Sequence, residues 1–199
     1  MDKKRILGGV FALGLGGEGA TSAALAERLG VDEEDARRRL QELVASGDVE
    51  SVRGRVALTE KGRESVKVVF IGGGFEVIHR GHLYTIERAK GLGDVLVVSV
   101  ARDSTIRRRK KREPLAKEQE RVRLLSSMRQ VDAAILGVEG DIYETLEKVR
   151  PDVVALGYDQ YHLESEVARE GEKRGMKLKV VRLDSPYPKL KTSALLDEF

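Results

Sequence analysis

The chain has 199 residues, of which 41% are hydrophobic and 35% charged, so it has enough apolar material for one large or two small packed domains. It contains no cysteine, which excludes disulfide bonds and thiolate metal sites, and no apolar run as long as a membrane span. The N-terminal residues lack the hydrophobic stretch of a signal peptide, so we expect a soluble cytoplasmic protein with no membrane partner. The net charge of +3 is uneven, because residues 1–66 hold 11 Lys and Arg against 12 Asp and Glu.

Residues 1–66 have the pattern of helices followed by a short hairpin. Ile6 and Val10 mark a first helix, and Thr21 and Asp32 are good N-caps for two further helices. Two short apolar runs separated by Arg53-Gly54 predict the hairpin. This order resembles a winged helix-turn-helix domain. We therefore expect such a domain over residues 1–66 and a second domain over residues 67–199.

From residue 67 onward, apolar strands alternate with helical patterns. The strand candidates are residues 68–71, 95–100, 133–136, 153–156 and 178–183. The helix candidates are residues 81–90, 117–128, 142–149, 163–174 and a short one from Thr192. Continuous apolar strands with intervening helices predict an α/β fold, with a Rossmann-like, doubly wound, parallel sheet of five strands. Ligands of such sheets bind at the carboxyl ends of the strands.

The segment 73–82 carries the strongest chemical signal. It follows a buried strand, contains Gly73, Gly74 and Gly81, and places His79 and His82 at the entrance of a helix. Unpaired N–H groups and the helix dipole favour anions there, and glycines let a phosphate approach the backbone. The alternative is a pair of partly exposed loop histidines. The pair is not expected to bind a metal, because no third ligand lies nearby in sequence. The remaining histidine, His162, is expected to be a surface residue.

At these residues the chain resembles a known family. Segment 73–82 is similar to the Gly-Thr-Phe-Asp-x-x-His-x-Gly-His signature of the cytidylyltransferase-like nucleotidyltransferases. Further similar segments, among them 100–103, 131–137 and 151–160, make the chain most similar to the archaeal FAD synthases, which are FMN adenylyltransferases. The sequence departs from the signature at two positions. Gly74 stands where the signature has Thr, and Glu76 stands where it has Asp.

The resemblance implies roles for several residues. His79, His82 and Lys110 would be catalytic, and Lys110 and Arg112 would belong to a mobile basic loop, residues 107–112, that closes over the phosphates. The residues implied to bind the nucleotide are Gly73, Gly74, Phe75, Gly81, Arg112, Arg129, Asp159, Thr192 and Ser193. No residue of the chain is implied as a metal ligand.

Four of these assignments have plainer alternatives. The basic run could be a solvated or nucleic-acid-attracting patch, and Arg129 could be a charge at a helix C-terminus. Asp159 could cap a helix that begins at Gln160, and Thr192-Ser193 could be an ordinary N-cap. Tyr158 or Tyr187 could stack on a flavin ring, although core packing is the commoner fate of an aromatic residue.

The expected activity is adenylyl transfer from ATP to FMN, which yields FAD and pyrophosphate and uses Mg²⁺ or another divalent cation. One alternative is a CTP-dependent cytidylyltransferase acting on a phosphorylated alcohol such as glycerol phosphate. The arginine-threonine pair of the glycerol-phosphate enzymes is absent, because Pro186-Tyr187 stands there. A second alternative to the expected activity is a DNA-binding regulator whose C-terminal domain senses a nucleotide or flavin. Residues 1–66 could also serve only to form a homodimer.

Overall fold

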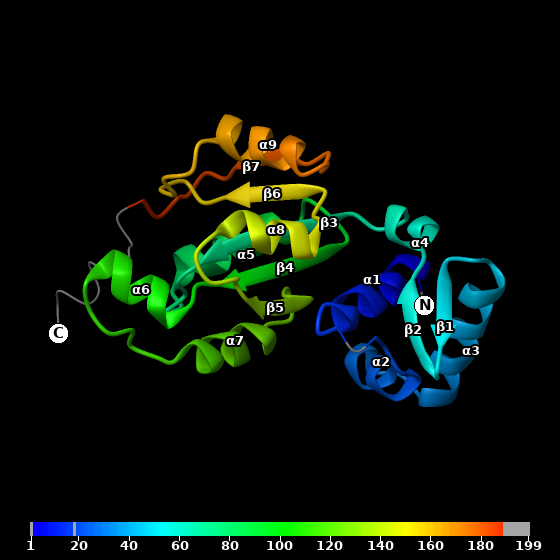
Figure 1. Ribbon diagram of the computed structural model, residues 1–199. Coiled ribbons are helices and arrows are strands. Elements are labelled where there is room, and N and C mark those ends of the chain that lie inside the picture. The colour runs from blue at the N-terminus through cyan, green and yellow to red at the C-terminus, as the bar shows by residue number, and fades with distance from the viewer. Residues whose placement is uncertain (1, 18, 189–199) are drawn as a thin grey trace. The chain divides into compact units, whose positions relative to one another are not determined.

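The computed structural model describes residues 2–17 and 19–188 (Figure 1). The chain divides into two compact units, Met1–Lys67 and Val68–Phe199, called unit 1 and unit 2 below. No helix among the described residues is long and apolar enough to cross a membrane.

Unit 1 consists of helices and one two-stranded hairpin. Its elements are α1 (Lys3–Gly14), α2 (Ser22–Leu29), α3 (Glu33–Ala45), β1 (Val49–Val52), β2 (Arg55–Leu58) and α4 (Glu60–Glu64). The side chains of Thr21 and Asp32 accept hydrogen bonds from the first turns of α2 and α3, as predicted. Arg53 and Gly54 both have positive φ, 53° and 77°, which is the backbone of a two-residue type I′ hairpin turn.

Unit 2 is a parallel sheet covered by helices on both faces. Its strands are β3 (Val68–Gly73), β4 (Val95–Val100), β5 (Ala133–Leu136), β6 (Val153–Leu156) and β7 (Lys179–Arg182). They pair in parallel in the order β5-β4-β3-β6-β7, which confirms the predicted sheet. The helices are α5 (Arg80–Lys90), α6 (Asp103–Lys110), α7 (Glu118–Ser126), α8 (Ile142–Val149) and α9 (Glu164–Lys173).

The strand order creates a topological switch point between β3 and β6. The chain runs from β3 through β4 to β5 on one side, and then crosses back to β6 on the other side of β3. Right-handed crossovers put α5 and α7 on one face of the sheet and α8 and α9 on the opposite face. In Figure 1, α8 crosses in front of the sheet. The crevice at the carboxyl ends of β3 and β6 is where ligands of such sheets bind.

Two aspartates fasten the opposite, amino edge of the sheet. Asp152 accepts a hydrogen bond from the backbone N–H of Val68 at 2.6 Å, and Asp132 accepts one from Leu96 at 2.6 Å. Lys90 also donates to Asp132, at 2.5 Å. These carboxylates precede β6 and β5 and pair backbone groups at the strand starts, so their role is to hold the sheet rather than a ligand.

The structure corrects one predicted element. The run 107–112 was expected to be a mobile loop, but its first four residues form the last turn of α6. Arg and Lys are good helix formers, and cations at the C-terminal end of a helix are favoured by its dipole. The helix stops at Lys111, whose left-handed backbone has a φ of 56°. The short helix expected from Thr192 lies outside the described residues.

Candidate active site

The turn after β3 is shaped by Gly73 and Phe75. A Cβ on Gly73 would lie 2.9 Å from the ring of Phe75, so a larger residue would collide with it. Phe75 adopts a left-handed backbone with a φ of 50°, a conformation that costs a non-glycine residue about 1–3 kcal/mol. Burial of its ring in the core offsets this strain. The centroid of the Phe75 ring lies 5.3 Å from that of the His82 ring, so the two rings pack against each other.

The two histidines of the turn face each other. His79 is the N-cap of α5, and its Nδ1 accepts a hydrogen bond from the N–H of Gly81 at 3.2 Å. The rings of His79 and His82 are stacked, with their centroids 4.0 Å apart. Two imidazoles are therefore held together at the positive end of a helix, which is an arrangement suited to a phosphate.

Burial keeps the histidine pair uncharged. Burial, and then the neighbouring His79, lower the pKa of His82 from 6.5 to about 4. The pKa of His79 is also lowered by burial, while Asp159 opposes the shift. Both imidazoles are therefore neutral near pH 7 in the free protein. Because the Nδ1 of His79 accepts from Gly81, its Nε2–H is left to donate to a phosphate oxygen. His82 makes a hydrogen bond with the backbone of Val77, and its buried Nδ1 has no partner among the described residues, so Nδ1 is the atom that can meet a phosphate oxygen when it carries the proton.

The lowered pKa of His82 makes the stability of the protein depend on pH. Between about pH 4 and pH 6.5 the unfolded chain binds a proton at His82 that the folded chain does not bind, so the free energy of unfolding should rise with pH in this window. A shift of this size corresponds to about 3 kcal/mol at most. Urea unfolding followed by circular dichroism, at pH values across the window, measures the slope. His82→Gln should flatten it, and equal slopes in the two proteins would contradict the burial argument.

A cavity of about 270 Å³ opens beside the histidines, at the switch point between β3 and β6. Six of the predicted site residues line it: Gly73, Phe75, His79, Gly81, His82 and Lys110. Asp159, from the loop after β6, is a seventh, and its negative charge opposes the lowering of the pKa of both histidines. We call this space the switch-point cavity.

Glu76 links the glycine turn to the basic run. Its side chain is fully buried and pairs with Lys110 and with Arg112, whose Nη1 lies 2.7 Å from Oε1. Burial opposes ionisation of this carboxyl, but hydrogen bonds from Arg112 and Lys110 outweigh it and hold the pKa of Glu76 below its ordinary value. Lys110 also lines the switch-point cavity, whereas Arg112 does not. The contact that Arg112 makes with this site is therefore its ion pair with Glu76.

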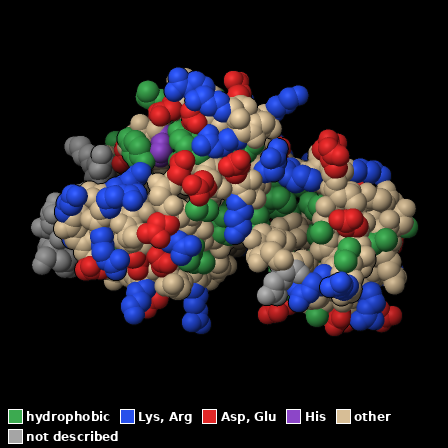
Figure 2. Space-filling view, in the orientation of Figure 1, with side chains coloured by type: hydrophobic (Ala, Val, Ile, Leu, Met, Phe, Trp, Pro, Cys, Tyr) green, Lys and Arg blue, Asp and Glu red, His purple; other side chains and the backbone are tan. Residues whose placement is uncertain are grey.

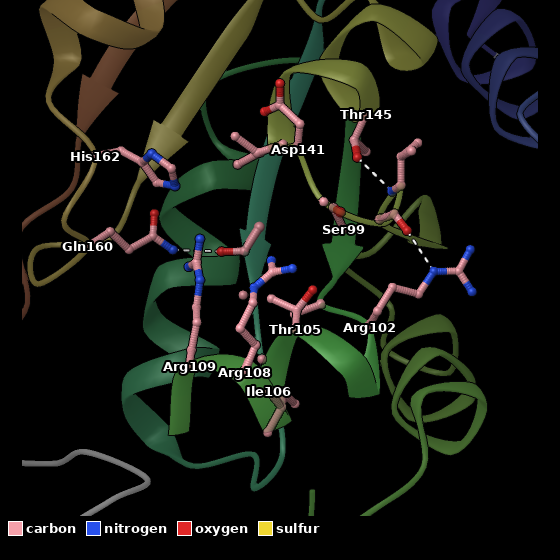
Figure 3. Close-up of a pocket in the computed structure, with 18 of the residues that line it drawn as sticks. Ser99, Arg102, Thr105, Ile106, Arg108, Arg109, Asp141, Thr145, Gln160 and His162 are labelled. Carbon is pink, nitrogen blue, oxygen red and sulfur yellow. Dashed lines mark hydrogen bonds between the residues drawn. The ribbon is translucent and has the colours of Figure 1, made fainter. Parts of the chain in front are cut away.

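A second cavity, of about 240 Å³, lies on the α8 face of the sheet, at the carboxyl ends of β3, β4 and β5 (Figure 3). Its walls include Gly74, Ser99, Arg108, Arg109, Ile142 and His162. Gln160 lines both this cavity and the switch-point cavity, and its amide donates to the Gly72 carbonyl at 2.6 Å. A Cβ on Gly74 would have no neighbour closer than 4.0 Å, so the threonine of the signature would fit here. We call this space the α8-side cavity.

Arg121 on α7 is a buried residue whose role sequence reasoning missed. Its side chain is 1% exposed and forms an ion pair with Asp103 at 2.6 Å. It also donates to the carbonyls of Gly74 at 2.6 Å, Ala101 at 2.9 Å and Ala116 at 3.0 Å. The guanidinium therefore joins the ends of β3 and β4 to α6 and α7. Its helical spacing of four from the buried Leu125 puts it on the core face, which was the available signal.

Two predicted site residues, Arg112 and Arg129, line neither cavity. Arg129 is exposed and precedes β5 by a few residues, so it lies toward the amino edge of the sheet, opposite the histidines. A phosphate-binding role for Arg129 requires it to reach the ligand that the histidines bind. In a parallel sheet the amino ends and the carboxyl ends of the strands lie at opposite edges, so this topology separates Arg129 from the histidines. Thr192 and Ser193 lie outside the described residues.

The described residues contain no group of three or more His, Asp or Glu side chains that could hold a metal ion. A divalent cation bound here would thus take most of its ligands from phosphate oxygens and water, as Mg²⁺ commonly does.

Comparison with known proteins places unit 2 among nucleotide-transferring enzymes. A family described as cytidylyltransferase-like matches residues 70–196. An FAD synthase from Aciduliprofundum boonei is 48% identical over 115 residues, which are 58% of this chain and 76% of that protein. Another, from Ferroglobus placidus, is 46% identical over 118 residues, 59% of this chain and 76% of that protein.

Among solved structures, the chain is similar to a Thermoplasma volcanium protein described as a lipopolysaccharide core biosynthesis protein. The two are 42% identical, with a TM-score of 0.58, over 60% of this chain and 98% of that one.

Proposed function

Because the chain belongs to the cytidylyltransferase-like family, we propose that it is an FAD synthase, which transfers the adenylyl group of ATP to FMN and releases pyrophosphate. The observation that carries the proposal is the sequence identity of 46–48% to FAD synthases, over a region whose turn holds two stacked histidines beside the switch-point cavity. Cytidylyl transfer to glycerol phosphate is not favoured by these relatives.

In this reaction an oxygen of the FMN phosphate attacks the α-phosphorus of ATP, and the bond from that phosphorus to the bridging oxygen of pyrophosphate breaks. His79 and His82 donate N–H hydrogen bonds to the phosphate oxygens, on which charge accumulates in the transition state. Lys110 has three donors, so it can keep its contact with Glu76 and also hold a phosphate oxygen. No enzyme nucleophile is required. A Mg²⁺ ion, when bound, would neutralise charge on the phosphates.

The two cavities fit two substrates. We assign ATP to the switch-point cavity, because the histidine pair and Lys110 line it. We assign FMN to the α8-side cavity, which meets the first at Gly73, Lys110 and Gln160. The FMN phosphate would then reach the α-phosphate of ATP across the glycine turn.

Purified protein incubated with ATP, Mg²⁺ and FMN should form FAD and one pyrophosphate per FAD, as measured by chromatography and a pyrophosphate assay. CTP in place of ATP and glycerol phosphate in place of FMN are the matched controls. Turnover of CTP with glycerol phosphate and none with FMN would overturn the proposal in favour of a cytidylyltransferase.

For unit 1 we infer a winged helix-turn-helix domain, supported by the order of α2, α3 and the hairpin. Its charges do not favour DNA binding, which requires cations free to neutralise phosphates. The three arginines of α3 pair with carboxylates of the same helix: Arg37 with Glu33, Arg38 with Asp35 and Arg39 with Glu42. On the face in view in Figure 2, acidic side chains lie among the basic ones of this unit.

A further inference from the structure

Tyr161, in the loop between β6 and α9, is an aromatic residue that the fold does not bury. It is 63% exposed, although an aromatic side chain usually contributes to a core. It also lines the α8-side cavity. An exposed ring at the rim of a cavity is a surface on which a flat ligand can stack.

Arg109 and His162 both contact this ring. The guanidinium of Arg109, on α6, lies 4.6 Å from the ring centroid and also donates to the tyrosine hydroxyl. The imidazole of His162 lies 4.0 Å from the ring centroid, tilted by 35°. Figure 3 shows Arg109 and His162 among the side chains that line the cavity.

The remaining tyrosines near this edge are placed otherwise. Tyr187 packs under Arg80, 4.6 Å from its guanidinium, and edge-on against Tyr84. Tyr158 lines the switch-point cavity and donates to the Pro188 carbonyl at 3.0 Å. The two tyrosines singled out in the sequence as candidates for flavin stacking therefore do not line the α8-side cavity, whereas Tyr161 does.

The α8-side cavity is lined by both apolar and cationic side chains. Ile106, Val138 and Ile142 are apolar, while Arg108 and Arg109 are cationic donors. An isoalloxazine ring has matching edges, because its dimethylbenzene side is apolar and its pyrimidine side presents carbonyl oxygens. Burial, and then the charge of Arg109, lower the pKa of His162, so the imidazole beside Tyr161 is neutral near pH 7.

We propose that Tyr161, held by Arg109, is the platform that binds the isoalloxazine ring of FMN and selects it over phosphorylated alcohols. This inference rests on the proposed function. A flavin stacked on Tyr161 gains aromatic contact, and Arg109 can donate to a flavin carbonyl once the ligand covers the ring. An acceptor without a ring, such as glycerol phosphate, gains neither contact.

FMN binding without ATP tests the proposal, since stacking on an aromatic residue quenches flavin fluorescence. Titration of FMN with the full-length protein should show quenching that saturates. Tyr161→Ala should remove most of the quenching and weaken FMN binding by about 10-fold, the size expected for one stacking contact. Its KM for FMN should rise by a similar factor, with the KM for ATP unchanged. Tyr161→Phe should keep the quenching.

Leu163→Ala is the matched control, because Leu163 lies in the same loop, is 61% exposed and does not line the cavity. It should bind FMN like the wild type. Arg109→Gln should weaken FMN binding as well, and it tests the platform independently should Tyr161→Ala fail to fold.

Wild-type affinity and quenching in Tyr161→Ala, with FAD still formed, would overturn this inference alone. A wild-type protein that neither binds FMN nor forms FAD would overturn the proposed function, and the inference with it.

Discussion

Replacement of His82 by alanine is expected to lower kcat for FAD formation by about 10²–10³, the effect of removing one preorganised donor to a transition-state oxyanion. The imidazole of His82 lies at the entrance of α5 and is stacked on His79, 4.0 Å away, beside the switch-point cavity. Charge on the phosphate oxygens grows as the bond to pyrophosphate breaks, so the donor contributes most in the transition state. The KM for ATP should therefore change much less than kcat.

Steady-state kinetics at saturating ATP and FMN measure this effect. Leu83→Ala, at the next position of α5, is the matched control, because Leu83 is 45% exposed and lines neither cavity. It should keep wild-type kcat. The thermal midpoint of His82→Ala should show a folded protein. A folded variant with near-wild-type kcat would remove His82 from the reaction and leave the histidine pair with a structural role only.

Arg121→Met should cost about 3–5 kcal/mol of stability, which is the usual effect of deleting one partner of a buried ion pair. Methionine has a similar length and no donors, so Asp103 and the carbonyls of Gly74, Ala101 and Ala116 would lose their shared partner. For a unit of this size, the loss corresponds to a fall in Tm on the order of 10–15 °C. Activity should fall as well, because Gly74 belongs to the turn that carries the histidines.

Thermal and urea unfolding measure this loss. Arg123→Met is the matched control, since Arg123 lies on the same helix and is exposed. It should change the stability by less than about 0.5 kcal/mol. Arg121→Lys should recover little, because an ammonium lacks the planar set of donors that reaches several carbonyls at once. Equal stabilities of Arg121→Met and Arg123→Met would show that the buried guanidinium does not hold the turn.

Local patterns were enough to predict most of unit 2. Each strand is a short apolar run, and the helix over residues 142–149 was predicted with the bounds that the structure shows. The main error was the basic run, because a series of Arg and Lys is compatible with both a solvated loop and a helical turn. Sequence neighbours decide only weakly between these two states. The burial of Ile106 and the ion pair of Asp103 with Arg121 are tertiary contacts of α6 that the local pattern does not contain.

Local chemistry predicted the part of the candidate site whose residues are close in sequence, whereas Lys110 and Asp159 were predicted through the family resemblance. Gly73, His79 and His82 share one turn, and the chemistry of a glycine turn at a helix entrance indicates a phosphate directly. Arg129 is the contrasting example. Its residue type suits a phosphate, but its distance from the histidines depends on which edge of the sheet it occupies, and it precedes its strand.

The sequence by itself determined the order of strands and helices, the glycine turn with its two histidines, and the resemblance to nucleotidyltransferases. These features depend on residues within about ten positions of one another. Only the tertiary structure decided that Glu76 pairs with Lys110 and Arg112, that Arg121 is buried under the turn, and that Tyr161 meets Arg109. Such contacts join residues from 18 to 52 positions apart. A parallel sheet brings them together because its crossovers return each strand end to the same edge.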